Sequence, residues 1–231
     1  MQGEKNTGKA GTGGRPLMLV PRNTTIFAFA LIVDVNDYSA MVSSEQALLV
    51  AQFTRDVLSG GIAAVEDCGG SVMGFMGDAF LALLPDAQST FLACAGIAKD
   101  LDNQCEYIST SQERDSEAWP FAAGGPSLKI AFESGWIETS EISSRELGTQ
   151  TLLAGQAINY ANRISAAGGG NRCLCGPSSA EQLRLVGYEK ILDGPHSFQG
   201  KKDMLFDFFE LDLGEFWRSG PRNEGDESFW G

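Results

Sequence analysis

The chain has 231 residues, 43% of them hydrophobic, so it can bury a full core, and one domain with tails is the simplest organisation. Its net charge of −13 argues against nucleic acid or an anionic membrane as a partner, because both attract basic surfaces. The five cysteines show no paired CxxC spacing and the only histidine is His196, which predicts reduced thiols in a cytoplasmic protein and disfavours a zinc site. No stretch of the sequence approaches the length of a membrane span.

The N-terminal residues 1–21 are rich in Gly, Lys and Thr and show no apolar periodicity, so we expect a flexible tail there rather than a signal peptide. Within this tail, Gly3–Lys9 matches most of a phosphate-binding P-loop, but Ala10 replaces the required Ser or Thr and no strand precedes the match. We therefore discard the P-loop and expect one folded domain over residues 22–213, with a C-terminal tail over residues 214–231.

The first predicted strand ends in a carboxylate. The run Ile26–Val33 is apolar without alternation, which is typical of a strand buried on both faces, and Asp34 follows it. A carboxylate in such surroundings is costly unless another group compensates it. Apolar residues then recur at helical spacing through Glu45–Cys68, which predicts a helix that ends at Gly69.

A hairpin is predicted after this helix, because the apolar runs Val72–Met76 and Ala79–Leu84 flank Gly77 and Asp78. A strand, a crossover helix and a second strand in one sheet are normally parallel, so Asp34 and Asp78 should share one edge of the sheet. Either acid alone is most simply a cap or turn residue. Two acids with no basic residue nearby in sequence repel each other, and divalent cations relieve this repulsion, so we favour a metal site.

The later elements are predicted from the same patterns. Asp102–Gly125 is polar and too irregular for regular structure, which indicates a surface insertion, and His196 is expected in a loop. The other expected elements are a helix over Gln88–Leu101, a strand over Ser127–Trp136, a loop and then a helix within Gly148–Ala167, a strand over Arg172–Cys175, a helix over Ser178–Leu185 and a final apolar segment over Met204–Leu213.

Asn159 and Arg163 lie four residues apart in a predicted helix, so their side chains project from one face of it. A polar pair on a solvated face is the simplest interpretation of this spacing alone. The two residues nevertheless belong to the segment Gly155–Arg163, which takes part in a wider resemblance.

Three blocks of the sequence, in this order, resemble the signature blocks of the class III nucleotidyl cyclases: Asp34 in IVDVNDYS, Asp78 in MGDAFLA, and Asn159 with Arg163 in GQAINYANR. The resemblance covers roughly residues 26–210. It implies a ferredoxin-like α/β core, with a central sheet flanked by helices, that pairs head-to-tail into a homodimer. Each active site would then take both aspartates from one protomer and the Asn/Arg pair from the other.

The same resemblance implies roles for individual residues. Asp34 and Asp78 would hold two Mg²⁺ or Mn²⁺ ions, with the Val35 carbonyl as an additional ligand. Asn159 would orient the ribose, and Arg163 would meet charge that develops on the α-phosphate. Lys201 would replace the lysine expected near the last strand, where Gln199 stands. The phosphates would be cradled by the backbone amides of Val35, Asn36, Asp37 and Tyr38.

Two departures from the family pattern concern the nucleotide base. Gly74 and Leu152 stand where purine-specific cyclases of this family usually carry polar base-reading residues. A pyrimidine is smaller than a purine, so Tyr38 is a candidate wall of the base pocket, with core packing as an equally good alternative.

A closer resemblance is to the bacterial pyrimidine cyclases of Pycsar anti-phage defence, which make cyclic UMP or cyclic CMP as an infection signal for a separate effector. The segments that carry it are Phe53–Gly61, Gly74–Phe80, Ala154–Ala161 and Glu210–Arg218.

The sequence therefore predicts a cytoplasmic, homodimeric, metal-dependent cyclase that converts UTP, or CTP, to the 3′,5′-cyclic nucleotide and diphosphate. Two alternatives stay open, an adenylate cyclase and a catalytically dead cyclase-like domain that serves dimerisation or regulation. A phosphodiesterase or phosphatase that uses the same two acids is disfavoured, because such a site usually needs more histidine ligands than His196 alone.

Overall fold

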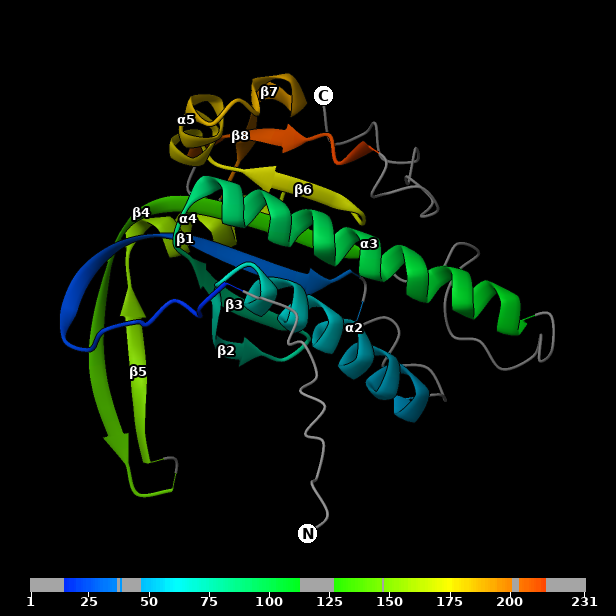
Figure 1. The fold of residues 1–231 in the computed structure, drawn as a ribbon, viewed down its shortest axis with the longest axis horizontal. Helices are drawn as coiled ribbons and strands as arrows, with labels where there is room; N and C mark the ends of the chain where they lie inside the picture. The colour runs from blue at the N-terminus through cyan, green and yellow to red at the C-terminus, as the bar shows by residue number, and fades with distance from the viewer. Residues whose placement is uncertain are drawn as a thin grey trace, which may run out of the picture.

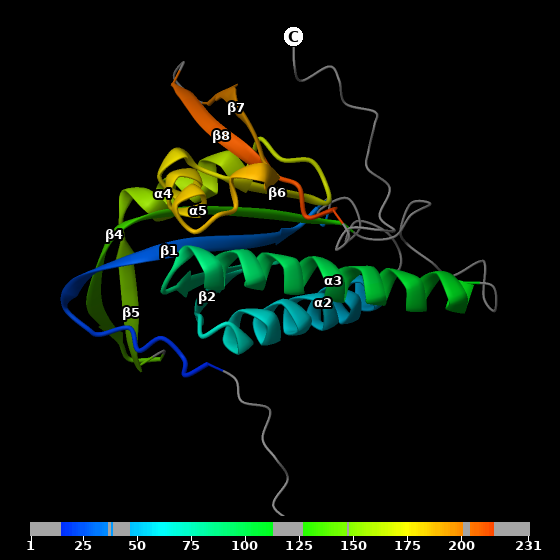
Figure 2. The same cartoon turned by 45° about the horizontal axis from the view of Figure 1, so that its top comes forward.

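The computed structural model describes residues 15–36, 38, 47–112, 127–146, 148–200 and 204–214 (Figure 1). In this part of the chain, eight strands form one sheet. Helices α2 and α3 cover one face of the sheet, and α4 lies on the opposite face (Figure 2). Among the described helices, none combines the length and the apolar composition that a membrane span requires.

The first half of the domain is a βαββαβ unit with the strand order β2-β3-β1-β4. This is the ferredoxin-like arrangement, as predicted. Strand β1 is antiparallel to β3, and β3 is antiparallel to β2, so β1 and β2 run parallel and end at the same edge. The elements are β1 (Thr24–Val35), α2 (Ala47–Asp67), β2 (Ser71–Met76), β3 (Ala79–Leu84), α3 (Ala87–Gln112) and β4 (Leu128–Ser144).

The second half extends the sheet from β4. Strand β6 pairs with β4 in parallel, β8 pairs with β6 and with β7 in antiparallel fashion, and β5 pairs with the far half of β4. The elements are β5 (Gly148–Ala154), α4 (Gln156–Ser165), β6 (Arg172–Cys175), α5 (Pro177–Leu185), the short 3₁₀ helix η1 (Glu189–Ile191), β7 (Leu192–Gln199) and β8 (Leu205–Leu211).

Strand β1 is buried on both faces, as its unbroken apolar run predicts. Phe29, Leu31 and Val33 belong to the main core beneath α2, α3 and α5, whereas Ala28 and Ala30 belong to a smaller cluster with Ala157 of α4. Successive side chains of a strand point to opposite faces, so Asp34 extends the α4 side of β1. All five cysteines are thiols rather than disulfides and four of them are buried, in agreement with the sequence.

Three predictions of secondary structure were wrong. Helix α3 does not end at Leu101 but continues to Gln112, into the segment predicted as irregular. Strand β4 continues to Ser144 and pairs with β5, where a loop was expected, and His196 lies in β7 rather than in a loop. These parts carry many polar side chains, and β5 and β7 are sheet edges, so they lack the apolar periodicity by which a buried element is recognised.

The folded part of the chain begins before residue 22, where the sequence placed its boundary. The Met18 amide donates a hydrogen bond to the Gly69 carbonyl at 2.8 Å, and the Ser71 hydroxyl donates to the Met18 carbonyl at 2.7 Å. Arg15 donates to the Ser89 hydroxyl at 2.7 Å, at the start of α3. Residues 1–14 and 215–231, which make up most of the two predicted tails, lie outside the described residues.

Glu133 of β4 fixes the position of α5 from inside the protein. Its side chain is buried, and its carboxylate accepts hydrogen bonds from the amides of Ser178 at 3.0 Å and Ser179 at 3.4 Å, in the first turn of α5. Burial raises the pKa of Glu133, and the hydrogen bonds from the two serines oppose this increase. The buried carboxylate therefore serves the amides at the N-terminus of the helix, which have no partner within it.

We expect Glu133→Ala to lower the free energy of unfolding by about 1–3 kcal/mol, because two helix N-terminal amides, of which that of Ser179 is buried, lose their acceptor. Glu133→Gln keeps an acceptor oxygen and should cost less. Because the pKa of Glu133 is raised in the folded state, ionisation of this side chain lowers the free energy of unfolding of the wild type as the pH rises through that pKa. Glu133→Gln lacks this ionisation, so its free energy of unfolding should increase relative to that of the wild type as the pH rises. Urea unfolding at several pH values measures both effects, and equal losses for the two variants would contradict this role.

Candidate active site

Asp34 and Asp78 meet at the edge where β1 and β2 end, as the strand order predicts. Asp34 is paired in register with Ala79, and the Val35 amide donates a hydrogen bond to the Asp78 carbonyl at 3.2 Å. The turn before β3 has a positive φ of 71° at Gly77 but not at Asp78, which is the pattern of a type II′ hairpin. The backbone thus fixes the two acids side by side.

The Asp34 carboxyl is poorly compensated within the chain. Burial raises its pKa most, the neighbouring charge of Asp78 raises it further, and Lys129 lowers it. The Asp78 charge thus disfavours the charged form of Asp34, which is the condition that a bound cation relieves.

Lys129 is a site residue that sequence reasoning missed. It lies on β4 directly opposite Asp34, and paired residues of neighbouring strands share one face of the sheet. The Asp34/Asp78 pair has no basic neighbour in sequence, but it has one in space. The one signal that could have located Lys129 is the register between β1 and β4, which pairs residues almost a hundred positions apart.

The two carboxylates fit a cation that brings part of its own coordination shell. Among the described residues, no group of three or more His, Cys, Asp or Glu side chains is placed to hold a metal ion. Magnesium, however, is commonly bound in proteins through one or two carboxylates together with the phosphates of a ligand. Asp34 and Asp78 meet that requirement, with hard oxygen donors set at one edge.

Two of the four amides predicted to cradle phosphates have acceptors within the chain in the ligand-free structure. The Val35 amide donates to Asp78, and the Asn36 amide donates to the Ser127 carbonyl at 2.9 Å. Asp37 lies outside the described residues. The Tyr38 side chain is partly buried against the main core, which is the packing alternative for this residue.

Asn159 and Arg163 are exposed on α4, whose opposite face is buried through Ala157, Ala161 and Ile164. Arg163 is not among the charged groups that shift the pKa of Asp34, which are Asp78 and Lys129. Within one chain, therefore, Arg163 does not act on the charge of the Asp34 carboxyl. The pair is presented to solvent, where a second molecule can reach it.

The two positions linked to base recognition stand in open surroundings. Gly74 lies in β2, and a Cβ atom built there would meet no atom within 4 Å. Leu152 lies in β5 with its side chain 52% exposed. Their sequence neighbours Met73 and Leu153 pack against the same small cluster on the α4 side of the sheet. Lys201 lies outside the described residues, between β7 and β8 in the chain.

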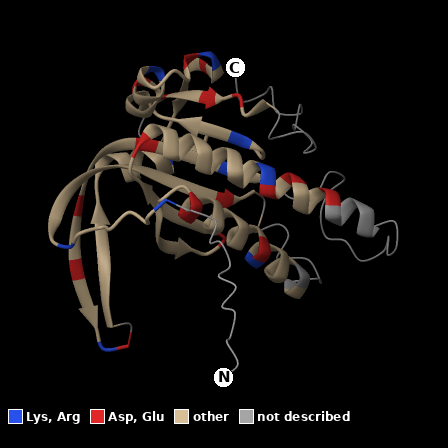
Figure 3. Ribbon diagram, viewed as in Figure 1, with Lys and Arg blue, Asp and Glu red and all other residues tan. Residues whose placement is uncertain are grey.

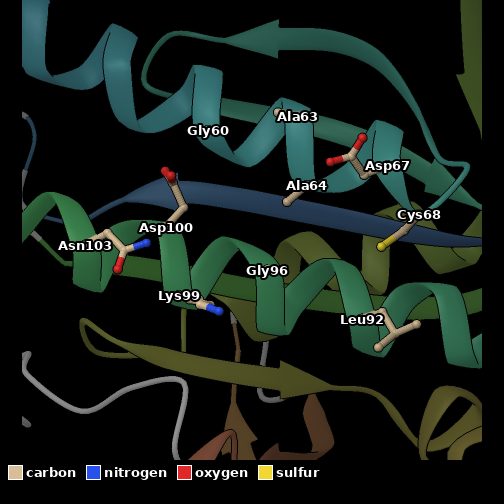
Figure 4. A pocket seen from close by; sticks show the side chains of 10 residues that line it. All are labelled: Gly60, Ala63, Ala64, Asp67, Cys68, Leu92, Gly96, Lys99, Asp100 and Asn103. Carbon is tan, nitrogen blue, oxygen red and sulfur yellow. The ribbon is translucent and has the colours of Figure 1, made fainter. Parts of the chain in front are cut away.

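A groove of about 360 Å³ runs between α2 and α3 (Figure 4). The helices approach closely there, since a Cβ atom at Gly96 would lie 3.1 Å from that of Ala64. Lys99 and Asp100 lie along its rim (Figure 4). Among the described residues, those that line this groove include none of the predicted site residues, so it is separate from the edge that holds Asp34 and Asp78.

Comparisons with known proteins identify the fold. The guanylyl cyclase Cya2 is 16% identical with a TM-score of 0.66, over 87% of this chain and 99% of that one. The guanylate cyclase domain of RhGC from Catenaria anguillulae, solved with GTP, is 14% identical with a TM-score of 0.61, over 81% and 97% of the two chains. The adenylyl cyclase CyaB from P. aeruginosa is 10% identical with a TM-score of 0.58, over 81% and 95%.

The sequence itself matches no protein-family model and no curated protein. The structural likeness is therefore one of fold, and it spans nearly the whole length of each of these three cyclase chains. The chain has the class III cyclase fold, with a mixed α/β sheet flanked by helices. Another similar structure is described as a non-canonical dimeric guanylyl cyclase domain of the RhoGC fusion protein from the aquatic fungus Blastocladiella emersonii, at 12% identity and a TM-score of 0.58 over 81% of this chain and 97% of that one.

Proposed function

We propose that this protein is a metal-dependent nucleotidyl cyclase that converts a nucleoside triphosphate to the 3′,5′-cyclic nucleotide and diphosphate. The observation that carries the proposal is the convergence of Asp34 and Asp78 at one edge of a sheet with the class III cyclase fold. The motif resemblance gives these two residues the metal-binding role. The partial burial of Asp34 and its repulsion by Asp78 supply an independent physical reason for a cation there.

The residues of this edge would act on the triphosphate. Divalent cations held by Asp34 and Asp78, Mg²⁺ or Mn²⁺, would neutralise the triphosphate and lower the pKa of the ribose 3′-hydroxyl. Lys129 lies opposite Asp34 and would attract the phosphate oxygens by its charge. The Val35 carbonyl stays a candidate metal ligand, because the hydrogen bond to Asp78 uses the Val35 amide and not its carbonyl.

The remaining groups would come from a second copy of the chain. Asn159 would orient the ribose, and Arg163 would meet the charge that develops on the α-phosphate, where a guanidinium held in place needs no reorganisation. Lys201 would supply a further positive charge to the phosphates. The exposure of Asn159 and Arg163 on α4 supports this arrangement, since each chain of a head-to-tail homodimer would present the pair to the aspartates of its partner.

We further propose a pyrimidine substrate, UTP in the first place and CTP in the second. Gly74 and Leu152 cannot offer side-chain hydrogen bonds to a base, and the space beside Gly74 is open. By resemblance to the bacterial pyrimidine cyclases, the cyclic product would signal infection to a separate effector.

The direct test is to incubate the purified protein with Mn²⁺ and each of the four ribonucleoside triphosphates, and to identify the products by mass. We expect cyclic UMP, with cyclic CMP as the next product, and loss of both in Asp78→Ala. Cyclic AMP as the sole product would overturn the pyrimidine assignment in favour of an adenylate cyclase. The absence of any cyclic product would favour a cyclase-like domain that serves dimerisation or regulation.

A further inference from the structure

A row of four charged residues, two basic ones flanked by an acid on each side, crosses the sheet next to the candidate site. Lys129 of β4 is paired with Asp34 of β1 on one side and with Arg172 of β6 on the other. Arg172 in turn forms an ion pair with Glu210 of β8. Figure 3 shows the basic stretch of β6 and the acidic stretches of β8, the strands that this ion pair joins. The order across the four strands is therefore Asp34, Lys129, Arg172 and Glu210.

All four side chains lie on the α4 side of the sheet. The register pairs Ala131 with Ile32 and with Leu174, and Ala131 and Leu174 share a cluster with Ile164 of α4. Lys129 and Arg172 lie two residues before Ala131 and Leu174, so they occupy the same face. Helix α4 covers the part of this face nearer the middle of the strands, whereas the charged row lies at the end that carries Asp34.

The spacing brings Arg172 within reach of a ligand bound at Asp34. Neighbouring strands lie about 5 Å apart, so the Arg172 backbone is about 10 Å from that of Asp34, with Lys129 between them. An arginine side chain spans most of that distance, and its fork of donors suits phosphate oxygens. The side chains of Arg172 and Glu210 are only 25% and 30% exposed, so the pair is partly screened from water.

We propose that Arg172 is a second phosphate-binding residue of this site, and that Glu210 holds it in place until a polyphosphate takes over the guanidinium. This inference rests on the proposed function, because it assumes that the phosphates of a nucleotide lie beside Asp34. Lys129 and Arg172 would then face the phosphates from adjacent strands, on the side of Asp34 opposite Asp78. In the ligand-free protein, the negative charge of Glu210 offsets the repulsion between the neighbouring cations Lys129 and Arg172.

The test uses inorganic pyrophosphate with Mn²⁺, a ligand whose binding needs no turnover, measured by calorimetry on the full chain. Arg172→Met should weaken binding about 10- to 100-fold, since a hydrogen bond to a charged group is lost. Arg172→Lys should retain part of the affinity through its charge. Glu210→Gln should tighten binding, because it releases Arg172 from its ion pair.

A matched control is available at the far end of β4, where Arg22 donates to Glu141 at 2.6 Å in another ion pair between distant segments. Arg22→Met should leave pyrophosphate binding unchanged. If Arg172 serves only to hold β6 against β8, Arg172→Met and Glu210→Gln will both lower the melting temperature without changing the affinity, and the proposal is overturned. Wild-type protein that fails to bind pyrophosphate overturns it as well.

The two proposals fail separately. If pyrophosphate binding depends on Arg172 but no nucleotide is cyclised, the phosphate site stands and the proposed reaction does not. If nucleotides are cyclised but Arg172→Met binds pyrophosphate as the wild type does, the reaction stands and the role of Arg172 does not. Where Arg172→Met fails to fold, Arg172→Lys and Glu210→Gln decide the question.

Discussion

Asp34→Asn is expected to remove cyclase activity while raising the stability of the metal-free protein. Loss of one fixed charged group from a catalytic site typically lowers the rate by a factor of about a hundred to a thousand, and a metal ligand should cost at least as much. The same charge is unfavourable in the empty fold, because Asp34 is partly buried beside Asp78 and only partly offset by Lys129. Cyclic product formation, measured with Mn²⁺, should therefore fall, whereas the urea midpoint of the metal-free protein should rise.

The control for this prediction is Asp56→Asn, on the exposed surface of α2, where the carboxylate pairs with Arg55 and is 57% exposed. It should change neither activity nor midpoint by a measurable amount. If Asp34→Asn lowers both activity and stability, the carboxylate has a structural partner that outweighs its burial and its repulsion by Asp78. If it retains activity, the metal-binding role assigned to Asp34 is wrong.

Mixing two inactive variants should restore activity if the site is shared between chains. Asp78→Ala removes one of the two acids proposed to bind metal and Arg163→Ala removes the exposed cation of α4, so each homodimer would lack one part of both its sites. In a mixed dimer, one site carries both defects and the other carries neither. Random reassociation makes about half of all dimers mixed, so about a quarter of wild-type activity is expected.

The control is a mixture of Asp78→Ala and Asp34→Ala. These two variants should not complement each other, because both aspartates of a site come from the same protomer. Mixed dimers are confirmed beforehand by copurification through two different tags. If Asp78→Ala and Arg163→Ala fail to complement in demonstrably mixed dimers, all four groups act within one chain, and α4 must move relative to β1 for catalysis.

The part of the fold that the sequence could predict is the part that is buried. The unbroken apolar run of β1 predicted one strand and the two runs around Gly77 predicted a hairpin, and their order was enough to place Asp34 beside Asp78. Strands β5 and β7 were missed because an edge strand is held by backbone hydrogen bonds to one neighbour and need not carry apolar side chains. His196 was placed in a loop for the same reason.

The charged neighbours of the site were beyond prediction for a different reason. Lys129 and Arg172 lie near the site because of the pairing register of β1, β4 and β6. This register depends on the whole sheet and is not visible in the sequence around either residue. Likewise, nothing in the residues around Val35 showed that its amide and that of Asn36 would bond to Asp78 and Ser127. Sequence motifs located the acids, whereas the electrostatic surroundings of those acids required the assembled sheet.

The empty space beside Gly74 bears on how such an enzyme could change its substrate in evolution. A Cβ atom at Gly74 would contact no other atom within 4 Å, so a larger residue there would disturb little of the packing that keeps the domain folded. A strand interior also tolerates most side chains better than it tolerates glycine. Under the proposed function, nucleobase preference could drift by single substitutions at almost no cost to folding, while the acids at the end of β1 and β2 stay fixed. Selectivity and stability would then be inherited as separate traits.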